Sequence, residues 1–393
     1  MTIVIYLQFL CYYIGKNFTA MRKIYLFSRF VLLLFPLTTL FAQVKINGRI
    51  QYDFEFLKRE QDSAWTMGNE FRRVHLSAAG KLASNLKYKI EVNFSHAKLG
   101  FRDVYIQYDA REWGSFAVGS KAEPTGLAML TSSKYIPFVE RPMLTALQDF
   151  RWGTGLHYAN HKLLDGRLGF QASLTNKGKH SEGFVDKHLE DGMNFTTRLY
   201  GVPYLDKENK TLVHTGVNYS TRTPADLKFR PENHLGSKYA YVFPGAARRL
   251  IAGGELAAVY KSFSLQTEYK MMQVPNMFDK DYAVPSFYVM GSFFLTGEYR
   301  PYKKGAFGRV KPKKPVGEEG FGALELLVRY SAMQFSDDLV QANIGNPSDI
   351  SNVAIGLNWY LNAHARIMYN YVLTDDKSQN NLMAHLIRFQ IDF

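Results

Sequence analysis

Apolar and polar residues alternate one by one in short runs along most of the chain after residue 43. In the first run, VKINGRIQYDF, the residues Val44, Ile46 and Ile50 fall on one face, and Lys45 and Arg49 fall on the other. A repeat of two residues is typical of a β-strand whose two faces meet different surroundings. The sequence therefore predicts a strand here, with one face toward an apolar environment and one toward water.

Runs of this kind recur along the whole chain after that point. The predicted strands span 44–54, 71–80, 86–95, 102–109, 115–121, 151–159, 167–176, 194–202, 212–222, 249–260, 263–272, 286–298, 321–331, 353–361, 366–372 and 382–393. An even number of alternating strands is typical of the barrels of bacterial outer membranes. We therefore predict an all-β fold, a transmembrane antiparallel β-barrel of about 16 strands. Residues 71–73 are a candidate β-bulge, which would reverse the faces of the residues that follow.

The connections between these strands alternate between short and long, as expected of turns at the periplasmic end and loops at the outer end. Two connections on the short side, 203–211 and 299–320, are longer than the others. The second is rich in Pro, Gly and Lys, and we place it at the periplasmic rim.

The segment 121–151 is the longest early interruption of the alternating pattern. Pro124 and Pro137 make it too irregular for a strand, and Leu127 and Phe138 are among several apolar residues that argue against disorder. A long apolar loop without regular structure usually packs against something and often carries function. We expect this loop to fold into the barrel lumen and to narrow the bore.

The first 42 residues have the pattern of a signal peptide. Basic residues precede the apolar run FVLLLFPLTTLFA, which ends in a small residue, so we predict cleavage before Gln43. Residues 1–20 lie ahead of Met21, where a signal peptide of ordinary length would begin, and we interpret them as a start-site extension; the alternative is a long translated leader. The mature chain, 43–393, is then one exported domain in the outer membrane of a Gram-negative bacterium.

The composition agrees with an exported barrel and limits the kinds of partner that the protein is expected to bind. Mean hydropathy is only -0.21 although 15% of residues are aromatic, which suits strands with one lipid face and one wet face. The one cysteine, Cys11, falls in the predicted signal peptide, so the mature chain would have no disulfide and no thiolate metal site. Loss of the signal peptide would lower the net charge from +13 to about +9. Because no long basic run is present, this excess favours small anions over nucleic acid.

Several stretches of the chain resemble a known family. They are NGRIQYDF, EFRRVHLSAAGKL, FRDVYIQYD, VGSKAEPTGLAMLTSSKYIPFVERP, SFFLTGEYRPYKKGAFGRVKP and GLNWYLN. Together they are similar to the phosphate-selective porin O and P family of Gram-negative outer membranes, in its Bacteroidetes-type branch. The resemblance covers essentially the whole mature chain. It implies a homotrimer of anion-preferring diffusion channels, each with its third external loop folded into the bore.

An anion in a narrow bore needs positive charge to offset its lost hydration, and Arg and Lys supply it. Strand parity places one set of bases on the lumen side: Arg73, Lys87, Lys89, Arg198 and Arg329. A second set lies on or beside the long loop: Lys121, Lys134, Arg141 and Arg151. We predict that both sets bind anions at the constriction. In the alternative interpretation these bases brace the barrel by pairing with wall carboxylates such as Glu91, Asp103, Glu255, Glu268 and Glu325.

The sequence predicts no catalytic residue, no cofactor and no metal site. The ten histidines show no ligand spacing repeated on one strand, and no Gly-rich phosphate loop of the nucleotide-binding kind is present. We predict a passive porin, not an enzyme, whose partners are outer-membrane lipid and small inorganic anions such as phosphate. The alternatives are a general non-selective porin, a barrel enzyme such as a lipid hydrolase, and an adhesin whose function lies in its outer loops.

Overall fold

The computed structural model describes residues 44–95, 99–176, 192–241, 248–277, 280–318, 320–336, 339, 348–377 and 381–393. The predicted signal peptide at 1–42, with its start-site extension at 1–20, lies outside the described residues. Among the residues that are described, no helix is both long enough and apolar enough to cross a bilayer.

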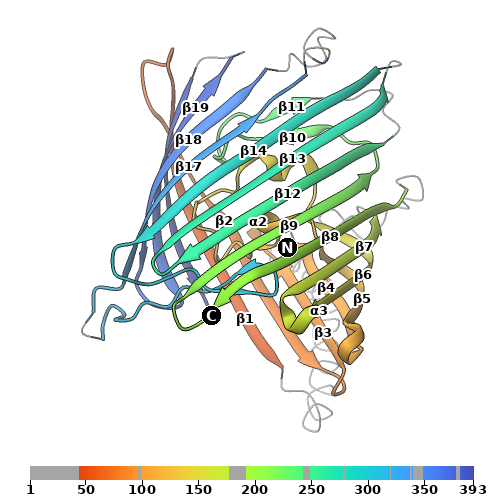
Figure 1. Cartoon of the computed structure of the whole chain (residues 1–393). Coiled ribbons are helices and arrows are strands. Elements are labelled where there is room, and N and C mark those ends of the chain that lie inside the picture. The colour runs from red at the N-terminus through yellow and green to blue at the C-terminus, as the bar shows by residue number, and fades with distance from the viewer. Residues whose placement is uncertain are drawn as a thin grey trace, which may run out of the picture.

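Sixteen antiparallel strands form a closed barrel in chain order, and the last strand pairs with the first (Figure 1). They are β1 (Lys45–Arg59), β2 (Thr66–Lys81), β3 (Leu86–Asn93), β4 (Gly100–Asp109), β5 (Ser115–Ala122), β6 (Trp152–Lys162), β7 (Leu168–Asn176), β8 (Asn194–Asp206), β9 (Thr211–Arg222), β12 (Arg249–Tyr260), β13 (Phe263–Met277), β14 (Lys280–Phe294), β17 (Ala323–Met333), β18 (Ile350–Tyr360), β19 (Ala365–Asp376) and β20 (Leu382–Asp392). Each predicted strand overlaps one of these, so the all-β, 16-strand antiparallel barrel is confirmed.

Short elements occupy the connections between the barrel strands. Two are hairpins, β10 (Leu227–Phe229) with β11 (Tyr239–Tyr241) and β15 (Tyr302–Lys303) with β16 (Ala306–Phe307). Short helical elements of the described connections are η3 (Arg111–Trp113), α2 (Leu127–Leu130), η4 (Met143–Gln148) and α3 (Leu163–Gly166).

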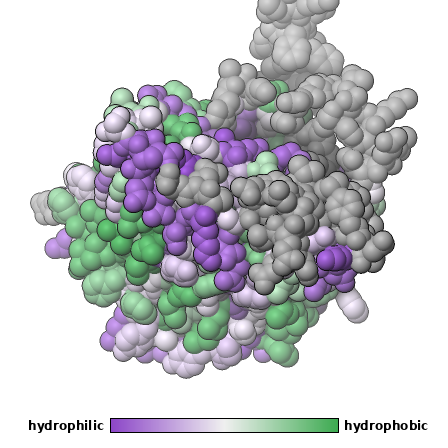
Figure 2. All heavy atoms as spheres, turned by 90° about the horizontal axis from the view of Figure 1, so that it is seen from above, coloured by the Kyte–Doolittle hydropathy of each residue, from purple (hydrophilic) through white to green (hydrophobic). Residues whose placement is uncertain are grey.

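The two faces of the wall differ as the alternating pattern predicts. On β20, Phe389 and Ile391 are 45% and 57% exposed, whereas Arg388 and Gln390, which alternate with them, are 0% and 3% exposed. Seen from above in Figure 2, hydrophobic atoms gather on parts of the outer wall and hydrophilic atoms lie nearer the centre. An apolar outer face and a polar inner face are what a barrel in lipid requires.

Two β-bulges turn arginine side chains inward. Gln51 lies opposite Arg73 and Tyr52 lies opposite Phe71, so Arg72 between them is the extra residue of the candidate bulge at 71–73. Between β3 and β4, Ile90 lies opposite Val104 and Val92 opposite Phe101, which is a second bulge that the sequence pattern did not indicate. This bulge leaves Arg102 and Asp103 opposite the single residue Glu91, and all three side chains border the interior.

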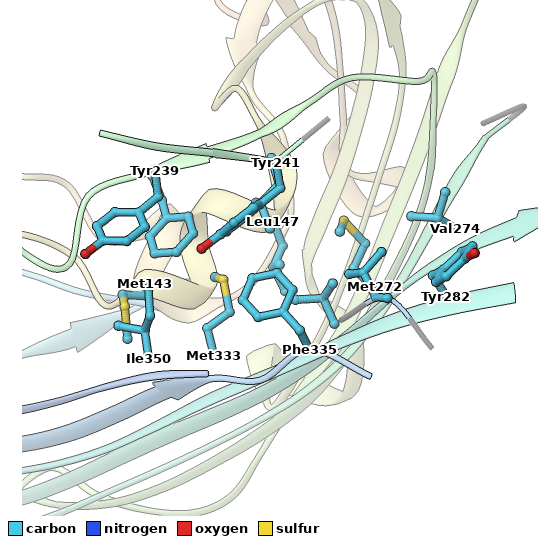
Figure 3. Packing of buried hydrophobic residues seen from close by; sticks show 14 of the residues in the cluster. Met143, Leu147, Tyr239, Tyr241, Met272, Val274, Tyr282, Met333, Phe335 and Ile350 are labelled. Carbon is cyan, nitrogen blue, oxygen red and sulfur yellow. The ribbon is translucent and has the colours of Figure 1, made fainter. Parts of the chain in front are cut away.

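The interior near the long loops is apolar on one side and covered by two inserted elements. Inward side chains of β12, β13, β14, β17 and β18 pack against η4 and against the β10–β11 hairpin. Figure 3 shows Tyr239 and Tyr241 of this hairpin above Met333 and Phe335 of the wall, with Met143 and Leu147 of η4 in the same cluster. This half of the barrel is therefore filled by protein.

The β15–β16 hairpin of the connection 299–320 enters the barrel, which corrects the prediction for that part, whereas most of 311–318 is exposed and Val316 binds the turn after β18 at Leu361. Phe307 is buried against Leu127 of α2, because its ring is too apolar to remain in water. The tip passes close to the wall at Gly305, whose φ of 76° favours glycine. There the carbonyl oxygen of Gly305 accepts a hydrogen bond of 2.9 Å from Arg198.

The seam between the first and last strands is joined by a buried ion pair. Arg388 of β20 donates to both carboxylate oxygens of Asp53 on β1, at 2.7 and 2.6 Å, and both side chains are fully buried. Two parallel hydrogen bonds of this kind fix the relative position of the strands as well as their charges.

Replacing Asp53 by Ala should lower the free energy of unfolding by about 3–5 kcal/mol, because Arg388 would stay buried without this carboxylate. The urea midpoint of the refolded protein in lipid measures the effect. The matched control is Lys377→Ala, which removes an exposed partner of Asp349 and should leave the midpoint unchanged. Equal midpoints for Asp53→Ala and the parent would contradict a stabilising seam.

Candidate functional site

Two cavities lie end to end along the inner wall formed by the first strands. The larger, about 700 Å³, is bordered by Lys87, Asp109 and Lys162, which lie beside the short turns. The smaller, about 440 Å³, reaches Lys228 and Lys238 of the β10–β11 hairpin region, on the side of the long loops. We call them the inner and the outer cavity.

The cavities share four lining residues, which define a neck between them. These residues are His75, Ser133, Arg151 and Trp152. His75 comes from β2 and Trp152 begins β6, whereas Ser133 and Arg151 belong to the segment between β5 and β6. A solute moving from one cavity to the other would pass these side chains.

The lining of both cavities is strongly basic. Eight Arg and Lys side chains and three acidic ones border the outer cavity. Nine Arg and Lys side chains and three acidic ones border the inner cavity. Because fixed charges of one sign in a confined space raise the local concentration of the opposite ion, this path favours anions.

The segment 123–150 is held against the inner wall through its backbone carbonyl groups. Wall side chains donate to eight of its oxygens: Lys270 to Thr125, Gln51 to Ser133, Gln390 to Lys134, Arg366 to Ile136, Asn358 to Pro137, Arg388 to Val139, Arg329 to Glu140 and Arg249 to Leu147. Irregular backbone inside a protein needs such partners, since an unpaired buried carbonyl costs free energy. Six of the donors come from strands β1 and β17–β20, and the other two, Arg249 and Lys270, come from β12 and β13, so the segment follows the wall along both stretches.

Seven of the nine predicted site residues line the two cavities. They are Arg73 and Arg141 in the outer cavity, Lys87, Lys89, Lys121 and Lys134 in the inner cavity, and Arg151 in both. The other two line neither. Arg198 is fully buried and lies 2.6 Å from Glu255, and Arg329 is 3% exposed and bound to Glu232. Their contacts are those of bracing residues.

Some of the lining cations are balanced by nearby carboxylates. Lys89 lies 2.6 Å from both Glu91 and Asp103, and Lys87 is paired with Asp109. The contacts of Lys134 with Asp392, at 3.6 Å, and of Arg73 with Glu140, at 3.9 Å, are longer. These four residues therefore contribute less net charge to the path than their number suggests.

Three predicted residues form no ion pair in the part of the chain that the structure describes. Arg141 donates to the backbone oxygens of Ala128 and Thr131, at 3.0 and 2.7 Å. Arg151 donates to the carbonyl of Leu130, and Lys121 donates to the amide oxygen of Gln107 at 3.0 Å. A neutral acceptor holds a cation in place without removing its field, so these three are the best placed to attract an anion.

Two groups of the segment between β5 and β6 have shifted acidities with clear causes. Burial lowers the pKa of the Arg151 guanidinium to about 10, which still leaves it charged at neutral pH. Burial alone would raise the pKa of Glu140, but Arg72, Arg73 and Arg388 hold it well below its ordinary value. Glu140 is therefore an anion that gathers three arginines beside the outer cavity.

The sequence analysis missed several lining cations. They are Arg49, Arg72, Arg102, Arg111, Lys162, Lys228, Arg230, Lys238 and Lys304. Arg49 lies on the polar face of the first predicted strand and could have been found from parity. Arg102 could not, because the bulge that turns it inward leaves no mark in the alternating pattern. Lys304 was missed because the connection that carries it was placed at the rim.

One carboxylate trio among the described residues is close enough to hold a metal ion: Asp53, Glu55 and Glu70. Asp53 is already bound to Arg388, and Glu55 accepts backbone hydrogen bonds from His234 and Leu235, at 2.9 and 2.8 Å. These partners account for the burial of two of the carboxylates without an ion, and we propose no metal site there.

Similar proteins come from several bacteria. Porin O of Pseudomonas aeruginosa is 27% identical over 386 residues, which covers 86% of this chain and 84% of that protein. An uncharacterized protein of Caulobacter vibrioides is 26% identical over 371 residues, with 84% of this chain and 68% of that protein covered.

Solved structures share the fold at low sequence identity. The anion-selective porin from Comamonas acidovorans has a TM-score of 0.56 and 11% identity, covering 90% of this chain and 100% of that one. A loop L8 deletion mutant of the Vibrio cholerae outer membrane protein OmpT has a TM-score of 0.56 and 13% identity, covering 90% and 99%. At such identities the likeness shows a common barrel architecture and no more.

The family match spans almost the whole described chain. Residues 44–393 match the family described as phosphate-selective porin O and P. That span begins one residue before β1 and ends with the last residue of the chain. The chain therefore belongs to the phosphate-selective porin O and P family.

Proposed function

We propose that this porin is a passive diffusion channel that prefers small anions such as phosphate. The observation that carries the proposal is the excess of Arg and Lys over acidic residues along both cavities, with Arg141, Arg151 and Lys121 held by neutral acceptors. Arginine suits oxyanions because its planar group can donate to two oxygens at once. The name of the family also suggests phosphate.

The family and the barrel point to an outer-membrane channel rather than to an enzyme or an adhesin. In the proposed channel, the segment 123–150 and the β15–β16 hairpin fill one side of the barrel, and the path of the anion follows the inner wall along β1–β7. The neck at His75, Ser133, Arg151 and Trp152 would then be the constriction. We further propose export by the predicted signal peptide and assembly as a homotrimer, the latter from the resemblance to porins.

The reversal potential of the refolded protein in a planar bilayer under a KCl gradient tests this function. We expect chloride to be more permeant than potassium, with a permeability ratio on the order of 10, because the fixed charge along the path is positive. Phosphate added to one side should reduce the chloride current if it binds in the bore. Open channels with equal or cation-favouring permeability would leave a general porin and exclude the anion preference.

Replacing Arg151 by Gln should lower the chloride-to-potassium permeability ratio by about three- to tenfold, because one positive charge leaves the neck. Reversal potentials in the same gradient provide the measurement. Lys377→Gln is the matched control, since it removes an equal charge from an exposed ion pair that lines neither cavity. Equal ratios in the two variants would mean that Arg151 does not set selectivity.

A further inference from the structure

Three cations that line the cavities lie on aromatic rings. The guanidinium carbons of Arg102 and Arg151 are 4.5 and 4.9 Å from the centre of the Trp152 ring. Lys121 lies 4.8 Å from the centre of the Tyr105 ring. The Nε atoms of Arg102 and Arg151 have no hydrogen-bond partner in the described protein, so the ring is a principal contact for both groups.

We propose that Trp152 is a positioning residue that determines ion selectivity, by holding Arg102 and Arg151 at the neck without neutralising them. The inference rests on the proposed function and deepens it. A carboxylate would hold an arginine more tightly, but it would also cancel its charge for a passing anion. An aromatic ring attracts a cation through its quadrupole and carries no net charge, so the field of the cation persists.

The indole has a second effect on the same charges. Its N–H donates to the Oδ1 atom of Asp103 at 2.9 Å, and Lys89 lies 2.6 Å from the Oδ2 atom of that residue. Both oxygens of Asp103 are thus occupied. Asp103 therefore has its hydrogen bond with the indole and its ion pair with Lys89, and it forms no ion pair with Arg102 or Arg151 in the part of the chain that the structure describes.

The location of Trp152 suits this role. It is the first residue of β6, pairs with Ala122 of β5, and borders both cavities. Arg102 borders the outer cavity, and Arg151 borders both. The Trp152 ring therefore contacts one cation of the outer cavity, Arg102, and one cation of the neck, Arg151.

The test compares reversal potentials of refolded full-length mature channels in a KCl gradient. Trp152→Leu removes the ring and should lower the chloride-to-potassium permeability ratio by about two- to fivefold, as expected for loss of cation–π contacts. Trp152→Phe keeps a ring and should retain most of the ratio. Trp359→Leu is the control, because Trp359 stacks on Phe321, 61% exposed, and lines neither cavity.

A variant cycle separates positioning from a general effect on structure. In a channel that already carries Arg102→Gln and Arg151→Gln, Trp152→Leu should change the ratio no further, because the cations on which the ring acts are gone. If Trp152→Leu does not yield folded channels, Trp152→Met makes the same test with a larger apolar side chain.

The outcomes distinguish this inference from the proposed function. An anion-preferring parent with an unchanged ratio in Trp152→Leu overturns the inference alone. The inference is also overturned if Trp359→Leu lowers the permeability ratio as much as Trp152→Leu does. It is overturned as well if Trp152→Leu still lowers the ratio in the channel that carries Arg102→Gln and Arg151→Gln. A parent channel without anion preference overturns both the inference and the proposed function.

Discussion

Backbone without regular structure can lie against the inner wall of a barrel only if the wall provides donors for its carbonyl groups. Here Arg366, Arg388, Arg329 and neighbouring amide side chains donate to successive carbonyls of the segment 123–150. Because of this constraint, the arginines on the side of β17–β20 bind the inserted segment. Their guanidinium groups hold protein, and they are not available to a solute.

The opposite side of the barrel has the reverse arrangement. Arg72, Arg102 and Arg151 border the cavities, and the inserted backbone takes only part of their hydrogen-bonding capacity, through the carbonyl of Leu130 that Arg151 binds. Two of them rest on an aromatic ring, and Arg72 pairs with Glu140. Arginine thus binds the inserted backbone on one side of the barrel and gives the cavities their positive charge on the other. The neighbouring residues decide which of these roles an arginine has.

The strands could be predicted from sequence because each wall residue faces either lipid or the interior, which imposes a period of two. The same reasoning found Arg73 and Lys89, but it could not separate Arg151 from Arg198. That difference depends on which half of the barrel is filled, and so on contacts such as Phe307 with Leu127 between segments far apart in the chain. The bulge at Arg102 was also hidden, because one extra residue changes parity without changing composition.

The double role of Arg388 has a consequence for the order of assembly. Arg388 belongs to the final strand, and it binds both Asp53 of the first strand and the carbonyl of Val139. A barrel that closed without the segment 123–150 would bury this guanidinium without two of its acceptors, the carbonyl of Val139 and the carboxylate of Glu140. Closure of the barrel is therefore more favourable with the segment in place, so the last strand pairing depends on the contents of the barrel.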